Sequence, residues 1–216
     1  MCEKQTVIQT IKVFNRNLKN RTFKLTICSN KGKPGQFVEE RLGIKLSSDC
    51  LDCLDGEIKL FPLKQLKNGK INPKETIAIT MRDLNEENIP IWEESSLKKK
   101  TNNMLFIPYI RLDNNQKYNK NGDYIQFFDC ITFNHTNMEY KEFENDYEKI
   151  ATHFRINGIK ERGNTINGTY IQSRTKGPGG DDKKKTVAFY FRRKQFVEDV
   201  LCKNLNIEIL TNISSK

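Results

Sequence analysis

The stretch Asp52-Cys53-Leu54-Asp55-Gly56-Glu57-Ile58-Lys59 predicts the feature around which the fold is organised. Its Asp-Gly pair favours a tight turn, because glycine adopts a positive φ angle without steric cost. We therefore expect a β-hairpin whose second strand begins at Glu57. Side chains of a strand alternate between its faces, so Glu57 and Lys59 would share one face while Ile58 points to the other. Asp52, before the turn, would lie across from Glu57, so that two carboxylates and an ammonium group converge.

Such a cluster suits a magnesium-dependent enzyme that cuts phosphodiester bonds. Mg²⁺ prefers oxygen ligands, and nucleases hold it with one or two carboxylates, a phosphate oxygen and waters. The metal activates a water and screens charge on phosphorus, while a nearby lysine orients or stabilises the attacking hydroxide. An ordinary solvated hairpin has the same residue pattern, so the rest of the chain has to decide between these interpretations.

The composition describes a basic, polar globular protein. Its 216 residues fit one domain, with 36% hydrophobic and 30% charged residues. The net charge of +10 favours a polyanionic partner such as nucleic acid. No apolar run approaches the roughly 18 residues of a membrane span, and the first residues lack the apolar core of a signal peptide, so we expect a cytoplasmic protein.

Cysteine and histidine are too sparse for two common kinds of site. Of six cysteines, only Cys50 and Cys53 are close in sequence, and the chain has two histidines. This argues against a structural zinc site and against a histidine-based catalytic triad.

Helical and strand patterns alternate along the chain. The most apolar run, Met104 to Ile110, is typical of a buried central strand. We expect the strand at 76–81 to lie beside the strand that begins at Glu57. Helices are expected at 6–14, 36–42, 92–100, 139–154 and 192–201, and further strands at 23–28 (or a short helical piece), 124–133, 169–172 and 187–191.

A glycine-rich loop with basic residues, 173–180, connects the last two expected strands. Such a loop can lie against a phosphate backbone or enter a groove of DNA. A flexible, solvated hairpin loop is an equal alternative.

In this order, the segments resemble MutH and the related type II restriction endonucleases of the PD-(D/E)xK superfamily. The resemblance runs from about residue 31 to about residue 201. It rests on the helix Gly35 to Gly43, on Asp52…Glu57-Ile58-Lys59, on the segments 92–100 and 105–108, on Tyr170-Ile171-Gln172-Ser173-Arg174-Thr175-Lys176 and on Phe189-Tyr190-Phe191-Arg192-Arg193.

The resemblance implies a restriction-endonuclease-like mixed central β-sheet flanked by helices, with a catalytic lobe at about 1–110 and a DNA-recognition lobe at about 111–216. It implies that Arg174 and Lys176 enter the major groove. The implied catalytic residues are Asp52, Glu57, Lys59, Glu39 and Lys100. The implied Mg²⁺ ligands are Asp52, Glu57 and the carbonyl of Ile58. The implied DNA-binding residues are Arg174, Thr175, Lys176, Gly177, Tyr190, Phe191 and Arg192.

The chain departs from the family pattern at three places. Asp52 stands closer to the glutamate than the metal-binding aspartate of MutH does, so Asp49 and Asp55 are rivals, Asp55 the weaker because it occupies the turn. The recognition loop has Thr175 where MutH has proline. The position that senses adenine methylation falls on Tyr190 or Phe191.

The expected function is Mg²⁺-dependent, sequence-specific cleavage of double-stranded DNA by a type II restriction enzyme, with GATC as the expected site. A Lys-, Asn- and Ile-rich composition indicates a low-GC genome, and nothing in the sequence identifies a contact for a mismatch-repair partner. A cognate DNA methyltransferase would be the functional partner, and a homodimer on DNA would cut both strands together. The alternatives are a MutH-type nicking enzyme and a non-catalytic basic DNA-binding module.

Overall fold

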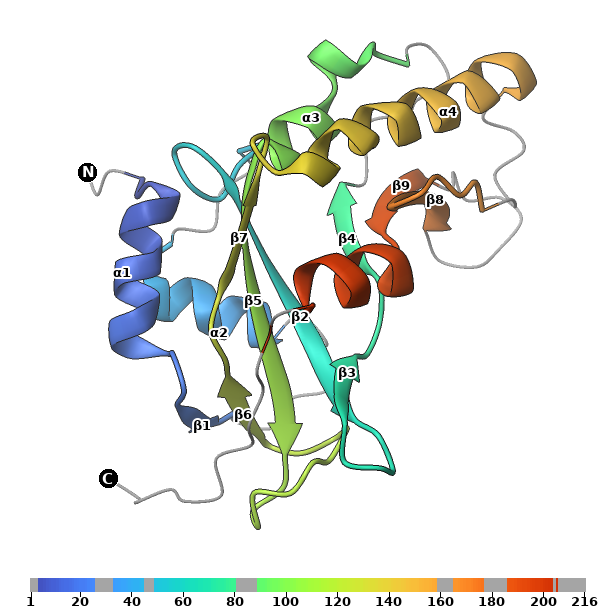
Figure 1. Ribbon diagram of the computed structural model, residues 1–216. Helices are drawn as coiled ribbons and strands as arrows, with labels where there is room; N and C mark the ends of the chain where they lie inside the picture. Colours follow the sequence, from blue (N-terminus) through green and yellow to red (C-terminus); the bar gives the residue numbers. More distant parts are fainter. Residues whose placement is uncertain are drawn as a thin grey trace.

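The chain folds around a mixed sheet with helices on both faces (Figure 1). The computed structural model describes residues 4–25, 33–44, 49–80, 89–158, 165–176, 186–203 and 205. The six strands of the central sheet are ordered β1 (Thr22–Lys24), β6 (Tyr124–Phe127), β5 (Asn103–Leu112), β2 (Glu57–Gln65) and β3 (Ile71–Pro73), and β7 (Ile131–Asn134) also pairs with β5. Among the pairings that the described strands of this sheet make, β2–β5 alone is parallel. The predicted mixed central sheet flanked by helices is confirmed.

Strand β5 is the predicted buried central strand. Met104 and Phe106 point into the hydrophobic core on one face of the sheet, and Leu105 and Ile107 point into the core on the other. All four side chains are fully buried. A continuous apolar run is therefore required here, because helices cover both faces of the sheet.

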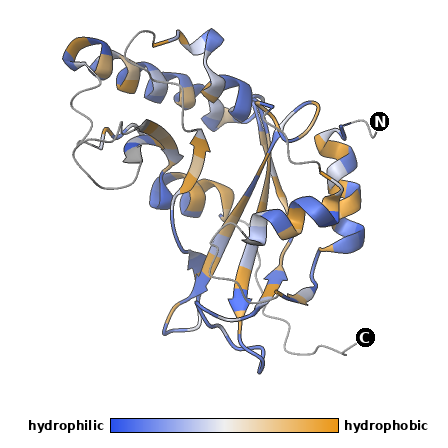
Figure 2. Ribbon diagram, turned by 180° about the vertical axis from the view of Figure 1, so that it is seen from behind, coloured by the Kyte–Doolittle hydropathy of each residue, from blue (hydrophilic) through white to orange (hydrophobic). Residues whose placement is uncertain are grey.

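One face of the sheet is covered by α1 (Val7–Asn17) and α2 (Lys33–Leu42), whose apolar sides pack on it. Thr6 and Gln9 form a capping box at the start of α1. Gly43, at φ +70°, ends α2 in the conformation that glycine adopts most easily. Figure 2 shows these helices with hydrophobic and hydrophilic stretches in alternation, as expected for helices that bury one side.

The other face is covered by α4 (Lys141–Asn157), the π-helix η3 (Arg193–Leu201) and a second sheet. This sheet has the strand order β4 (Ile77–Thr80), β9 (Thr186–Phe191) and β8 (Ile171–Lys176). Rings of Phe106, Phe143, Phe191 and Phe196 contact one another between the two sheets. The single-turn helices η1 (Trp92–Glu94) and η2 (Met138–Tyr140) and the short α3 (Ser96–Thr101) complete this side.

Three expectations about the strands are wrong. Residues 49–56 form an irregular loop and not the first strand of a hairpin. The expected strand at 124–133 is divided into β6 and β7, which pair with opposite halves of β5. Strand β4 pairs with β9 in the second sheet and not with β2, so its partner comes from far along the chain.

The expected helix at 92–100 is interrupted at Ser95. The side-chain oxygen of Ser95 accepts a hydrogen bond from the backbone N–H of Lys98, which starts α3 anew. The central sheet takes strands from both sides of residue 110, and the division into catalytic and recognition lobes stays a prediction. None of the helices within the described ranges has the length and apolar character needed to cross a membrane.

Candidate active site

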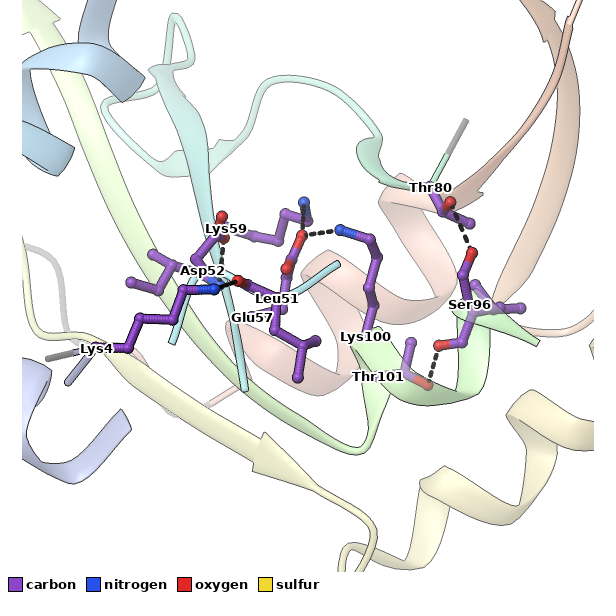
Figure 3. Close-up of polar contacts among 11 residues, drawn as sticks. Lys4, Leu51, Asp52, Glu57, Lys59, Thr80, Ser96, Lys100 and Thr101 are labelled. Carbon is purple, nitrogen blue, oxygen red and sulfur yellow. Dashed lines mark hydrogen bonds and ion pairs between the residues drawn. The ribbon is translucent and has the colours of Figure 1, made fainter. Parts of the chain in front are cut away.

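The Glu57 carboxylate is the centre of a cluster of charged side chains at the start of β2 (Figure 3). Its side chain is only 2% exposed. Its Oε1 atom accepts hydrogen bonds from Lys59 Nζ at 2.6 Å and from Lys100 Nζ at 2.7 Å. The predicted alternation along the strand therefore holds, and α3 supplies the second ammonium group. Two ammonium groups on one oxygen thus offset the cost of burying this carboxylate.

Lys100 is placed by the way α3 is anchored. Leu97 and Thr101 are fully buried under the helix, and Ser95 caps its start. Ser96 Oγ lies 3.2 Å from Thr80 Oγ1, which joins α3 to β4 of the second sheet. This anchoring leaves Lys100, on the remaining side of the last helical turn, directed at Glu57.

Asp52 reaches the cluster from the irregular loop. Its Oδ2 atom accepts a hydrogen bond at 3.0 Å from the backbone N–H of Ile58, the residue between Glu57 and Lys59. Burial raises the pKa of Asp52, and the nearby charge of Glu57 raises it further, while the Ile58 N–H and the two lysines act in the opposite direction. Asp52 and Glu57 are therefore close enough to act on one ligand.

Glu39 approaches the same cluster from α2. Burial and the charge of Asp52 raise the pKa of Glu39, and the charge of Lys59 opposes the shift. Its Oε2 atom is buried without a hydrogen-bond partner among the described residues. All five side chains expected from the sequence are thus gathered in one region, from α2, the loop, β2 and α3.

The two rival aspartates have other partners. Asp55 Oδ1 accepts a hydrogen bond from Val7 N at 2.7 Å at the start of α1. Asp49 Oδ2 forms an ion pair with Lys4 Nζ at 2.8 Å. Gly56 lies so close to the chain around it that an added Cβ would stand 2.4 Å from the carbonyl oxygen of Asn103. The Asp-Gly pair therefore serves a close approach of the loop to β5 and a contact with α1.

The donors present are suited to a hard cation. Glu57 Oε2, like Glu39 Oε2, is buried without a hydrogen-bond partner in the described part of the chain. Within those same ranges, no group of three or more His, Cys, Asp or Glu side chains is gathered as a metal site. A pair of carboxylates with free oxygens, supplemented by substrate phosphate and water, is the way in which proteins hold Mg²⁺ beside nucleic acid.

Most of the expected recognition residues lie on the hairpin β8–β9, and Arg174 occupies its exposed surface. Its guanidinium lies 5.5 Å from the centre of the Tyr190 ring, and its Nη1 lies 3.5 Å from Thr76 Oγ1. When the Gln172 amide oxygen faces the guanidinium, it accepts from Arg174 Nη2 at 2.8 Å. The contacts hold the guanidinium over the outer side of the second sheet.

The other expected DNA-binding residues differ in their placement. Phe191 is fully buried in the aromatic core, so the expected contact between its ring and DNA is wrong. Tyr190, which is half-buried, remains the candidate at this position. Arg192 Nη1 donates to the carbonyl oxygen of Gly168 at 2.5 Å, so its guanidinium makes a contact within the protein. Thr175 and Lys176 end β8, and Gly177 lies outside the described residues.

Two anchoring residues were missed in the sequence. Asp146, on α4, accepts hydrogen bonds from the N–H groups of Thr169, Tyr170 and Ile171 at the start of the hairpin. Lys4 donates to the carbonyl oxygen of Leu51, beside Asp52. The only signal for Asp146 was an acidic residue on the apolar side of a helix, and Lys4 gave none.

Comparison with known proteins connects the cluster to one family. The family model described as DNA mismatch repair enzyme MutH matches residues 43–146, which include Asp52, Glu57, Lys59 and Lys100. The resemblance expected from the sequence is confirmed over this range. The curated proteins give no significant match.

Among solved structures, the chain is similar to one titled "Restriction endonuclease MvaI-cognate DNA substrate complex". The identity is 14%, the match covers 87% of this chain and 91% of that chain, and the TM-score is 0.40. At this TM-score the two chains share too little geometry for the likeness to carry a functional conclusion.

Proposed function

We propose that this chain, MutH-like over residues 43–146, is a Mg²⁺-dependent endonuclease that cuts double-stranded DNA at a specific site. The observation that carries the proposal is the buried Glu57 carboxylate, with Lys59 and Lys100 on one oxygen and Asp52 beside it. A protein that only binds DNA gains nothing from gathering carboxylates where they would repel phosphates, whereas a nuclease needs them to hold a cation.

Asp52 and Glu57 would hold the Mg²⁺ ion, together with the carbonyl oxygen of Ile58. The buried Oε2 atom of Glu57 without a partner among the described residues supports this assignment. When bound, Mg²⁺ lowers the pKa of a coordinated water and screens the charge that develops on the scissile phosphate. Glu39 would complete the set of carboxylates, directly or through water.

The lysines would act on the attacking water and on the phosphate. In the structure, Lys59 and Lys100 share Glu57 Oε1, so each ammonium group is held within reach of a phosphate that enters the cluster. Lys59 would orient the water whose oxygen attacks phosphorus, and the charge of Lys100 would stabilise the phosphate as negative charge builds on its oxygens. Hydrolysis is completed when the bond from phosphorus to the leaving sugar oxygen breaks.

Sequence recognition would lie on the second sheet. The exposed guanidinium of Arg174 is held over Tyr190, and a guanidinium can donate two hydrogen bonds to O6 and N7 of guanine in the major groove. GATC is the proposed site because of the resemblance of residues 170–176 to the family's recognition loop. Lys176 would add a contact from the end of β8, and the resemblance assigns a further contact to Gly177.

We propose that the enzyme is a type II restriction endonuclease of the cytoplasm, and that its functional partner is a cognate DNA methyltransferase. A homodimer on DNA would cut both strands. A mismatch-repair nicking enzyme is the second candidate, favoured by the description of the matching family. The products of cleavage distinguish the two.

The test uses supercoiled plasmid that carries GATC sites and a matched plasmid from which these sites have been removed. Linear product that depends on Mg²⁺ and on GATC supports a restriction enzyme, and nicked circles support a nicking enzyme. Glu57→Gln, which keeps the shape of the side chain and removes its charge, is the catalytic control. Binding of both plasmids without any cleavage in Mg²⁺ would identify a DNA-binding module and reject the enzyme.

A further inference from the structure

We infer that Lys4 is a positioning residue for the active site, because it holds the loop that carries Asp52. Its Nζ donates to the carbonyl oxygen of Leu51 at 2.6 Å (Figure 3). It also forms an ion pair with Asp49 Oδ2 at 2.8 Å. Leu51 is the residue immediately before Asp52. One ammonium group therefore fixes the backbone on the N-terminal side of the candidate metal ligand. The same group pairs with Asp49, the rival for the role of metal ligand. This inference rests on the proposed function.

The loop depends on the N-terminal segment at several points. Residues 49–56 form no strand, so they lack the ladder of hydrogen bonds that would fix a hairpin. Leu54 N instead donates to the carbonyl oxygen of Gln5 at 2.9 Å, and Val7 N donates to Asp55 Oδ1 at 2.7 Å. With Lys4, the segment 4–7 thus contacts the loop on both sides of Asp52.

The same segment also reaches the helix that carries Glu39. Gln5 Nε2 donates to the carbonyl oxygen of Leu42 at 3.0 Å, at the end of α2. The two carboxylates that approach Glu57 from outside β2 are therefore both positioned relative to segment 4–7. A displacement of this segment would move Asp52 and Glu39 together, while Glu57 and Lys59 would stay on the strand.

The exposure of Lys4 and Asp49 favours a positioning role of Lys4 over a stabilising one. The side chains of Lys4 and Asp49 are 31% and 60% exposed, and ion pairs so exposed contribute little to stability. The hydrogen bond to Leu51, by contrast, acts on a backbone atom one residue from Asp52. Loss of Lys4 should therefore change the geometry of the loop far more than the stability of the whole chain.

The test compares Lys4→Met, which keeps the aliphatic stem, with Lys4→Arg, which restores a charged donor. Lys12→Met is the matched control, because Lys12 is exposed on α1. The first measurement is hydrogen exchange in metal-free protein, over the peptide that contains the N–H groups of Leu54 and Ile58. Lys4→Met should lose protection there and keep it in β5, whereas Lys4→Arg and Lys12→Met should behave like the natural chain.

The second measurement is single-turnover cleavage in Mg²⁺, with DNA binding measured in Ca²⁺. Lys4→Met should slow cleavage roughly 10–100-fold, the effect expected of a displaced catalytic group, with DNA binding unchanged and the rate recovered in Lys4→Arg. If the natural chain does not cut DNA, the proposed function fails while hydrogen exchange still decides the role of Lys4. Unchanged protection of the loop in Lys4→Met, or an equal loss of protection in β5, would overturn the inference.

Discussion

At the scale of single residues, the two lysines that bind Glu57 come from different elements of the fold. Lys59 belongs to the same strand as Glu57, while Lys100 reaches it from α3. We predict that Lys100→Met slows cleavage by about 10²-fold, the usual size of the loss of one charge-stabilising group, and by less than Glu57→Gln does. The measurement is the single-turnover rate in Mg²⁺.

Lys99→Met is the matched control for this prediction. Lys99 is the exposed neighbour of Lys100 on the same helix, so its replacement removes the same charge without disturbing Glu57. If both variants slowed cleavage equally, the effect of Lys100 would come from the net charge of α3, and its assignment to the active site would be wrong.

The choice between Asp52 and Asp49 is also made at this scale. Asp52 lies against the Ile58 N–H beside Glu57, whereas Asp49 is paired with Lys4. We expect Asp52→Ala to lose several orders of magnitude in cleavage rate and to keep DNA binding in Ca²⁺, because it removes a metal ligand and leaves the DNA surface intact. Plasmid cleavage and a binding titration measure the two effects. Near-normal cutting by Asp52→Ala together with an inactive Asp49→Ala would reverse the assignment.

At the scale of elements, Asp146 joins the recognition hairpin to α4. Its side chain is 2% exposed and accepts three backbone N–H bonds, from Thr169, Tyr170 and Ile171. We predict that Asp146→Ala lowers the free energy of unfolding by about 3 kcal/mol or more, because it leaves these N–H groups buried without an acceptor. Urea denaturation measures the change, with exposed Glu144→Ala as the control. A loss no larger than that of the control would show that water replaces the carboxylate.

Elements whose pattern is local could be predicted from the sequence. The apolar run of β5 and the amphipathic pattern of α1 specify a buried strand and a surface helix by themselves. The partner of β4 could not be predicted, because β9 lies more than a hundred residues further along the chain and any alternating strand satisfies the same pattern. Pairing between distant segments is set by the packing of the whole core.

The candidate site shows the same division. Glu57 and Lys59 were predicted to share a face because the period of a strand is local, and they do. The expected hairpin before Glu57 does not form. Asp55 accepts a hydrogen bond from the start of α1, so the loop packs against α1 and not against a partner strand. Lys100 and Glu39 were expected at the site only from the resemblance, since no local pattern connects α3 or α2 to β2.

At the scale of the whole molecule, α3 lies between the two activities that we propose. Lys100, near its end, contacts Glu57 in the central sheet, and Ser96, at its start, contacts Thr80 in the second sheet. Strand β4, which carries Thr80, pairs directly with the recognition hairpin. One short helix therefore contacts both the cluster at Glu57 and the sheet that contains the recognition hairpin.

This arrangement makes the role of Arg174 testable against the charge of the molecule as a whole. With a net charge of +10, the chain should bind any DNA through its phosphates, and that part of the affinity falls as salt increases. Arg174 should add discrimination, because its guanidinium is exposed and held over Tyr190. We predict that Arg174→Ala loses roughly 1–3 kcal/mol of discrimination for each base contact, so that cleavage of a randomised site library becomes less specific.

Arg16→Ala, which removes an exposed arginine from α1, should lower affinity slightly and keep the site preference. If Arg174→Ala kept the preference of the natural chain and only bound all DNA less tightly, Arg174 would be a phosphate contact, and the sequence would be read by another part of the molecule.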